Sequence, residues 1–238
     1  MKNKTTYYDK TRAYYERVGN LWGIYTNQPY LIESFKYPGN HVKAIIERAN
    51  IKDGDTVLDC GCGFGKVLAS IQSIYPACKL SGVTLNQPHV DRKQHSNISV
   101  ENFEKLHHSD SSQDVVLFIE SFNHANDKRA VLSECYRVLK PGGTLFILDQ
   151  CVSNQTYRQV GKDTALRKLY REHMNFYGAS PVCLDYITKR ATSIGFEVST
   201  AIESVPNTIT TIQNSQIKRF IVADFLPTIY SELVFRKH

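Results

Sequence analysis

A glycine-rich turn directly after a short apolar run is the feature that most constrains how this chain can fold. Residues 57–65 read VLDCGCGFG, with glycine at every second position of the turn. Glycine has no Cβ, so the backbone there can turn tightly and approach a ligand closely. The segment therefore predicts a strand, a ligand-binding turn and the start of a helix. Its third glycine comes one residue earlier than in the Gly-x-Gly-x-x-Gly fingerprint, which disfavours a nicotinamide dinucleotide as the ligand.

Short apolar runs suited to strands alternate with helical patterns along the chain. Strands are expected at 55–59, 79–85, 98–101, 114–120, 144–149, 196–202 and 231–236, and helices at 41–50, 65–75, 88–95, 127–139, 156–177 and 181–194. Such alternation is typical of a parallel sheet with helices on both faces. The expected fold class is α/β: a Rossmann-like, doubly wound, mostly parallel seven-stranded sheet, with residues 1–50 as an N-terminal helical cap and a helical insertion after the fifth strand.

The composition is that of an ordinary globular protein, with 42% hydrophobic and 22% charged residues in a chain of 238. No apolar run reaches the ~18 residues of a membrane span, and the basic N-terminus lacks the apolar core of a signal peptide, so we expect a cytoplasmic protein. The six cysteines lack the paired spacing of a zinc site, and no metal is expected from them. The formal charge of +6 is spread along the chain, which favours a solvated basic surface over a preference for an anionic substrate.

Four segments in a fixed order resemble the motifs of class I methyltransferases that use S-adenosylmethionine. They are 57–65 (VLDCGCGFG), 80–87 (LSGVTLNQ), 114–124 (DVVLFIESFNH) and 137–143 (RVLKPGG). The resemblance implies S-adenosylmethionine as methyl donor, S-adenosylhomocysteine as product and a small-molecule acceptor. It also implies one methyltransferase domain over 1–238, divided into the cap 1–50, a donor-binding half 51–150 and an acceptor-binding half 151–238. Donor contacts are expected from Asp59, Gly61, Cys62, Gly63, Leu85 and Ile119.

The second motif departs from most of the class. An Asp or Glu usually ends the second strand and binds the ribose hydroxyls, whereas Thr84 stands there in this chain. Thr84 with Gln87 resembles the subgroup of cyclopropane fatty acid synthases and isoprenoid C-methyltransferases, which implies that these two side chains take over ribose contacts. The alternative is that Thr84 only ends a strand. At the position expected to lie near adenine, Asn102 is expected to bond the exocyclic amine and Phe103 to lie against the ring.

The aromatic N-terminus resembles that of sterol and other isoprenoid C-methyltransferases, in which a helical cap covers the donor. Tyr8, Tyr15 and Trp22 are the candidates for this role. Aromatic faces attract cations, so these side chains suit the positively charged sulfur of the donor. Packing of the helices among themselves is the alternative, since Tyr and Trp bury large areas in protein cores.

Glu120 and His124 are the candidate catalytic residues. They follow the fourth strand, and ligands of open α/β sheets bind beyond the carboxyl ends of the strands. Glu120 is expected to stabilise a cation or accept a proton, and His124 to act as a base near neutral pH. The alternatives are that Glu120 positions the donor or satisfies backbone amides, and that His124 is a surface residue.

Three functions stay open at this point. The first is C-methylation of an isoprenoid or similar alkene-bearing metabolite, as in natural product biosynthesis. The second is N- or O-methylation of a natural product or small polar metabolite. A non-catalytic donor-binding partner subunit is the third, disfavoured because the glycine turn is intact. No nucleic-acid-binding motif is present, so no nucleic-acid partner is expected. Mg²⁺ is expected only if the acceptor is a diphosphate. A homo-oligomer is left open.

Overall fold

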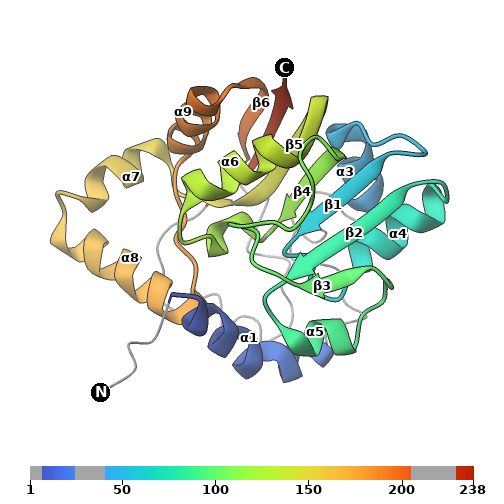
Figure 1. Ribbon diagram of the computed structural model, residues 1–238. Coiled ribbons are helices and arrows are strands. Elements are labelled where there is room, and N and C mark those ends of the chain that lie inside the picture. Colours follow the sequence, from blue (N-terminus) through green and yellow to red (C-terminus); the bar gives the residue numbers. More distant parts are fainter. Residues whose placement is uncertain (1–6, 25–40, 205–228) are drawn as a thin grey trace.

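The computed structural model describes residues 7–24, 41–204 and 229–238, and this part of the chain contains a seven-stranded sheet (Figure 1). The strand order is β3-β2-β1-β4-β5-β7-β6. The strands β1 to β5 pair in parallel, whereas β7 lies antiparallel between β5 and β6. The arrangement confirms the expected α/β fold with a mostly parallel, doubly wound sheet. The strands are β1 Thr56–Cys60, β2 Lys79–Thr84, β3 Ile98–Val100, β4 Gln113–Ile119, β5 Leu139–Cys151, β6 Phe196–Ser204 and β7 Ile229–Lys237.

Helices cover both faces of the sheet. The helices of the described residues are α1 Tyr7–Ile24, α3 His41–Ala49, α4 Lys66–Ile74, α5 Gln87–Asp91, α6 Lys128–Val138, α7 Asn154–Val160, α8 Thr164–Tyr177 and α9 Leu184–Ile194, with a short 3₁₀ helix η1 at Phe122–His124. Successive side chains of a strand point to opposite faces. On β4, Val115 and Leu117 therefore pack with α3 and α4, while Val116 and Phe118 pack with α6 and α9. Burial on both faces explains why this strand is apolar throughout.

The helix α1 lies along the edge at which the parallel strands end. Figure 1 shows it between α5, which follows β2, and the C-terminal end of α8. This placement agrees with the expected N-terminal cap. The part of the expected cap between α1 and α3 lies outside the described residues, as does most of the segment 206–229, for which the sequence predicts no element.

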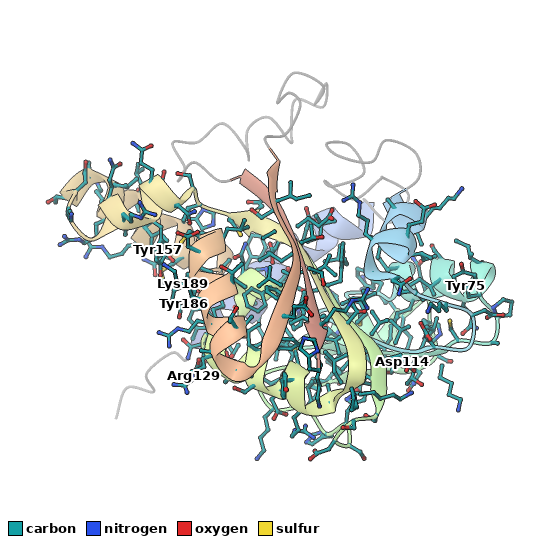
Figure 2. The ribbon with its side chains drawn as sticks, turned by 90° about the horizontal axis from the view of Figure 1, so that it is seen from above. Tyr75, Asp114, Arg129, Tyr157, Tyr186 and Lys189 are labelled. Atoms are coloured by element: carbon teal, nitrogen blue, oxygen red, sulfur yellow. The ribbon has the colours of Figure 1, made fainter. Side chains whose placement is uncertain are left out.

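The insertion after the fifth strand is two helices rather than the single helix expected at 156–177. α7 ends at Val160, with Gly161 as its C-cap residue. α8 begins at Thr164, after Asp163, whose side chain accepts a hydrogen bond from the Leu166 N–H at 3.0 Å. Asp is a strong N-cap residue because its carboxylate satisfies a free N–H of the first turn. The hairpin packs on α9 through Tyr157 and Tyr186, whose ring centroids are 5.9 Å apart; Figure 2 shows the two side by side.

Other elements also differ from their expected bounds, most of all α5 and β5. The helix expected at 88–95 is only the short α5, Gln87–Asp91. The strand expected at 144–149 extends over 139–151, because its first residue already pairs with β4 at Gln113 and its last pairs with β7. Pairing with two neighbours thus lengthens the strand beyond its apolar centre.

Candidate functional site

The glycine-rich turn after β1 leaves open space in front of its middle glycine. Gly61 and Gly63 have φ values of +84° and +54°, which L side chains rarely adopt. A Cβ on Gly61 would lie 2.4 Å from the Ser121 Cβ, so this glycine is required by packing against the loop after β4. A Cβ on Gly63 would meet no atom within 4 Å. The open side of Gly63 therefore gives a ligand access to the backbone of the turn.

Asp59 brings a buried carboxyl group to the same end of β1. It is 2% exposed, and burial raises its pKa to about 7. A cationic group of a ligand in front of the turn would compensate this carboxylate. The Cys62 side chain, in contrast, is packed against β2: a Cβ added to Gly82 would lie 2.6 Å from the Cys62 Sγ. This packing leaves the Cys62 backbone for a ligand contact.

Thr84, at the end of β2, is held by two local partners. Its Oγ1 lies 3.2 Å from the His89 Nδ1 and accepts a weak bond from the Asn86 N–H at 3.4 Å. Gln87 is exposed and donates to the Asp91 carboxylate at 2.8 Å, and Leu85 is half-buried. The Thr84 hydroxyl and the Gln87 amide thus each have protein partners of their own. Their contacts with the ribose of the donor stay a prediction.

Asn102 and Phe103 follow β3. The Asn102 Oδ1 accepts a hydrogen bond from the Glu104 N–H at 2.9 Å, which fixes the turn. Phe103 is 3% exposed and packs edge-to-face on Phe118, with 5.3 Å between ring centroids. Its ring therefore belongs to the core on the α6 side of the sheet, and a contact with adenine stays a prediction.

Tyr15 connects α1 to α5, which follows β2, and to η1, which follows β4. Its hydroxyl lies 3.0 Å from the His124 Nε2, and its ring meets the His89 ring edge-on at 5.7 Å. His89 in turn contacts Phe64 of the glycine-rich turn, with 4.6 Å between ring centroids. Tyr15 thus links the segments that follow β1 and β2 with the segment that follows β4.

Tyr8 anchors the first part of α1 on the other side. Its hydroxyl accepts a weak hydrogen bond from the Asn126 N–H at 3.4 Å. Burial and a hydrogen bond with Glu104 raise its pKa, so the phenol is neutral. Trp22 belongs to α1, but its side chain lies outside the described residues. The contacts of Tyr8, Tyr15 and Trp22 with the donor therefore stay a prediction.

The hydrogen-bond partners of His124 define its tautomer. Its Nδ1 lies 3.0 Å from the Gly178 carbonyl oxygen, which can only accept, so Nδ1 carries the proton. Nε2 then accepts a hydrogen bond from the Tyr15 hydroxyl. Burial lowers the pKa of His124 to about 4, which keeps the imidazole neutral at neutral pH. The Tyr15 oxygen is left with lone pairs that can accept a proton.

Gly178 also receives α1. The Thr11 hydroxyl donates to the same carbonyl oxygen at 2.8 Å. Gly178 has a φ of +60°, and a Cβ there would lie 2.6 Å from the Thr11 Cα. Thr11 and Tyr15 are one helical turn apart and share a face of α1. They close a hydrogen-bonded ring with Gly178 and His124 that fixes α1 on the site.

Glu120 adopts a strained backbone conformation directly after β4. Its φ is +54°, in the left-handed region that is uncommon for a residue with a side chain. Its N–H donates to the Leu148 carbonyl at 2.8 Å, which holds the strand ends together. Its negative charge contributes to raising the pKa of Tyr15, after burial and Tyr14. Ile119, the last residue of β4, is half-buried.

Asp149 supports η1 from the end of β5. Its carboxylate accepts hydrogen bonds from the Asn123 N–H at 2.9 Å and from the Asn123 amide at 2.8 Å. It is 4% exposed, and burial raises its pKa to about 6. The two bonds fix the residue that precedes His124, so this carboxylate positions the turn from behind.

Comparison with known proteins identifies the domain. Residues 58–147 match the family model of a methyltransferase domain. Over this segment, which is less than half of the chain, the sequence is that of a methyltransferase domain. By sequence, the chain is 29% identical over 170 residues to 24-methylenesterol C-methyltransferase 3 of Arabidopsis thaliana, a match that covers 66% of this chain and 46% of that protein. The chain thus spans less than half the length of this curated relative.

Two solved structures share the whole methyltransferase fold at low sequence identity. The cyclopropane synthase MmaA2 from Mycobacterium tuberculosis has a TM-score of 0.77 at 14% identity, covering 99% of this chain and 100% of that one. A geranyl diphosphate methyltransferase, solved with GPP and sinefungin, has a TM-score of 0.72 at 15% identity, covering 98% and 99%. At these identities the likeness establishes the fold.

S-adenosylmethionine fits the methyltransferase site on the evidence of its residues. The open side of Gly63 admits the donor to the turn, and the buried Asp59 carboxyl can pair with its amino group. Among the described residues, no group of three or more His, Cys, Asp or Glu side chains is placed to hold a metal ion. Within the same residues, no helix combines the length and hydropathy needed to cross a membrane.

Several site residues were not selected by sequence reasoning. Asp149 had a signal, because an acidic residue at the end of an apolar strand faces the ligand edge of an α/β sheet. Gly178 had a weaker sequence signal, because glycine often follows the last residue of a helix. The remaining residues had no sequence signal, since their roles depend on partners that the fold brings to them. The missed residues are Thr11, His89, Asn123, Asp149 and Gly178.

Proposed function

We propose that the protein transfers a methyl group from S-adenosylmethionine to a carbon atom of an isoprenoid or another alkene-bearing small molecule. The observation that carries the proposal is the Tyr15–His124 hydrogen bond, placed between the glycine-rich turn and the loop after β4. Sequence similarity to a sterol C-methyltransferase supports a carbon acceptor. The fold that the chain shares with a geranyl diphosphate methyltransferase is consistent with it.

The donor would be held by the backbone of the turn at Gly63 and by Asp59. When bound, it supplies a methyl group that is already activated by the positive charge on sulfur. The protein then has to orient the acceptor in line with that methyl group and to exclude water. The helix α1 serves both needs, because Thr11 and Tyr15 fix it over the strand ends. Residues 151–238 would contribute the acceptor-binding half.

Addition of a methyl group to a carbon–carbon double bond leaves a positive charge on the neighbouring carbon. The methyl–sulfur bond breaks, a carbon–carbon bond forms, and S-adenosylhomocysteine leaves. The Tyr15 ring and the Glu120 carboxylate can stabilise the cation, since both attract positive charge. The double bond re-forms when an adjacent C–H loses its proton.

The Tyr15–His124 pair can accept that proton. The Tyr15 oxygen takes the proton from the acceptor while its own proton moves to the His124 Nε2. Because the pKa of His124 is about 4, the pair is a weak base. A C–H beside a carbocation is acidic enough for a weak base. A phenol or an alkylammonium ion has a pKa of about 10 and is too weak an acid to give its proton to this pair. The pair therefore favours a carbon acceptor over a nitrogen or oxygen acceptor.

The test is methyl transfer from S-adenosylmethionine with a deuterated methyl group to two acceptor pools. One holds prenyl alcohols, prenyl diphosphates and sterols; the other holds small amines and phenols. We expect a product in the first pool that gains one labelled methyl group and loses one hydrogen from carbon. A product only in the second pool would contradict carbon methylation. Donor binding without transfer to either pool would indicate a non-catalytic subunit. A chelator added to the diphosphate reaction tests the need for Mg²⁺.

A further inference from the structure

Lys128 is a buried lysine at the start of α6. The residue is 4% exposed, although lysine is rarely buried without a charged partner. Its Nζ donates to the Asn123 carbonyl at 3.0 Å, the Ala125 carbonyl at 2.5 Å and the Ser180 Oγ at 2.9 Å. An ammonium group has three donors, and each has a neutral oxygen acceptor here. Burial lowers the pKa of Lys128 to about 7, although the negative charges of Asp149 and Glu104 act against this shift. Burial of an amine that can carry a charge is costly, so its retention calls for an explanation.

The three acceptors belong to the two segments that position His124. Asn123 and Ala125 are the residues immediately before and after it, and Lys128 holds the carbonyl oxygen of each. Ser180 comes two residues after Gly178, whose carbonyl accepts the His124 Nδ1–H. One side chain therefore joins the turn that carries the imidazole to the segment that selects its tautomer.

A second contact extends this link to α1. The Tyr7 hydroxyl donates to the Ser180 Oγ at 3.2 Å. Ser180 is therefore tied to α1 as well as to Lys128, and its own N–H donates to the Asn123 carbonyl at 2.9 Å. If Ser180 moved, the Gly178 carbonyl would move with it, and the acceptor for both Thr11 and His124 would be displaced.

We propose that Lys128 is a positioning residue for methyl transfer, which holds His124 in the tautomer and place that let it accept the Tyr15 hydroxyl proton. The proposal rests on the proposed function. Lys128 has no free donor for a substrate and does not act on it directly. In its protonated form Lys128 has a second effect, because its charge opposes protonation of the neighbouring imidazole. The titratable groups that face His124 are Tyr15 from α1, Lys128 from α6 and His173 from α8.

The test compares Lys128→Met with Arg129→Met in the full chain. Met keeps the unbranched side chain as far as Cε and removes the ammonium group with its three donors. Arg129 is the next residue of α6 and is exposed, so its variant is a matched control (Figure 2). For Lys128→Met we expect donor affinity within about twofold of wild type by calorimetry and kcat lower by about tenfold or more, a loss within the range of general acid–base catalysis. The acid limb of the kcat profile should move to higher pH. Arg129→Met should match wild type.

Nitrogen NMR of labelled histidine gives a readout that does not depend on activity. Wild type should show His124 with a proton on Nδ1 only, and Lys128→Met a mixture of tautomers. Should Lys128→Met fail to fold, Lys128→Gln, which keeps two N–H donors without the charge, takes its place with the same expectations. A folded variant with wild-type kcat and an unchanged His124 signal overturns the proposal. Absence of methyl transfer by wild type would count against the proposed function, while the tautomer measurement would still decide the role of Lys128.

Discussion

Tyr15 and His124, 109 residues apart in the chain, are joined by a hydrogen bond of 3.0 Å between the phenol oxygen and Nε2. The bond links the N-terminal helix to the loop that follows the central strand β4. It is directional, because the Gly178 carbonyl requires the proton of His124 to be on Nδ1. The phenol therefore donates to the imidazole, and its oxygen is free to receive a proton from a substrate.

Replacement of Tyr15 by Phe should slow turnover without weakening donor binding. The variant keeps the ring contact with His89 and removes the hydroxyl, so the proton has no route to His124. We expect kcat to fall by about 10²-fold, the lower end of the range for a general base, with donor Kd within about twofold. Tyr75→Phe, at the end of α4 away from the site (Figure 2), is the control. Equal kcat in both variants would show that the phenol is structural.

Gly63→Ala should block the donor without disturbing the fold. Its Cβ would enter the open side of the turn, where no protein atom lies within 4 Å. Gly142→Ala is a matched control, because Gly142 also has a positive φ, +78°, and open space around its Cβ position. Both variants should lose about 1 kcal/mol of unfolding free energy from backbone strain. Only Gly63→Ala should lose donor affinity, measured by calorimetry; if both bind the donor equally, the open side of Gly63 is not the donor site.

Donor binding should release a proton near neutral pH. Burial raises the pKa of Asp59 to about 7, so the carboxyl group is partly protonated there. The cationic amino group of the donor favours the ionised form and lowers this pKa, so a proton leaves on binding. Calorimetry at pH 7 in buffers of different ionisation enthalpy measures the release. Asp59→Asn should bind without it, and proton uptake by wild type would contradict the assignment.

Gly178→Ala should release α1 from the site. A Cβ would lie 2.6 Å from the Thr11 Cα, and the φ of +60° adds backbone strain. Trypsin cleavage after Lys10 and Arg12 should become at least about tenfold faster, since cleavage follows local opening, and kcat should fall. Gly161→Ala, with no atom within 4 Å of the added Cβ, should leave both unchanged. Slow cleavage of Gly178→Ala would mean that α1 is held by other contacts.

Local periodicity made most of the fold predictable from sequence. The apolar run at 114–120 is buried on both faces as β4, and the turn at 57–65 forms with the positive φ values that its glycines permit. The helix expected at 156–177 was divided, because the capping of α8 by Asp163 outweighed a continuous helical pattern. Tyr15 and His124 were both selected from the sequence, the first as an aromatic of the cap and the second for its place after a strand.

Their pairing was decided only by the tertiary structure. Spacing along the chain reports which residues share a face of one helix or strand, whereas a contact over 109 positions depends on how those elements pack. The same holds for Gly178, which sets the tautomer of His124 from 54 residues away. It holds most clearly for Lys128. A lysine at a helix start is ordinarily solvated, whereas this one is buried and donates to Ser180, 52 residues away, as well as to the nearby Asn123 carbonyl. The sequence by itself determined the fold and the glycine-rich turn; packing determined which side chains meet beside that turn.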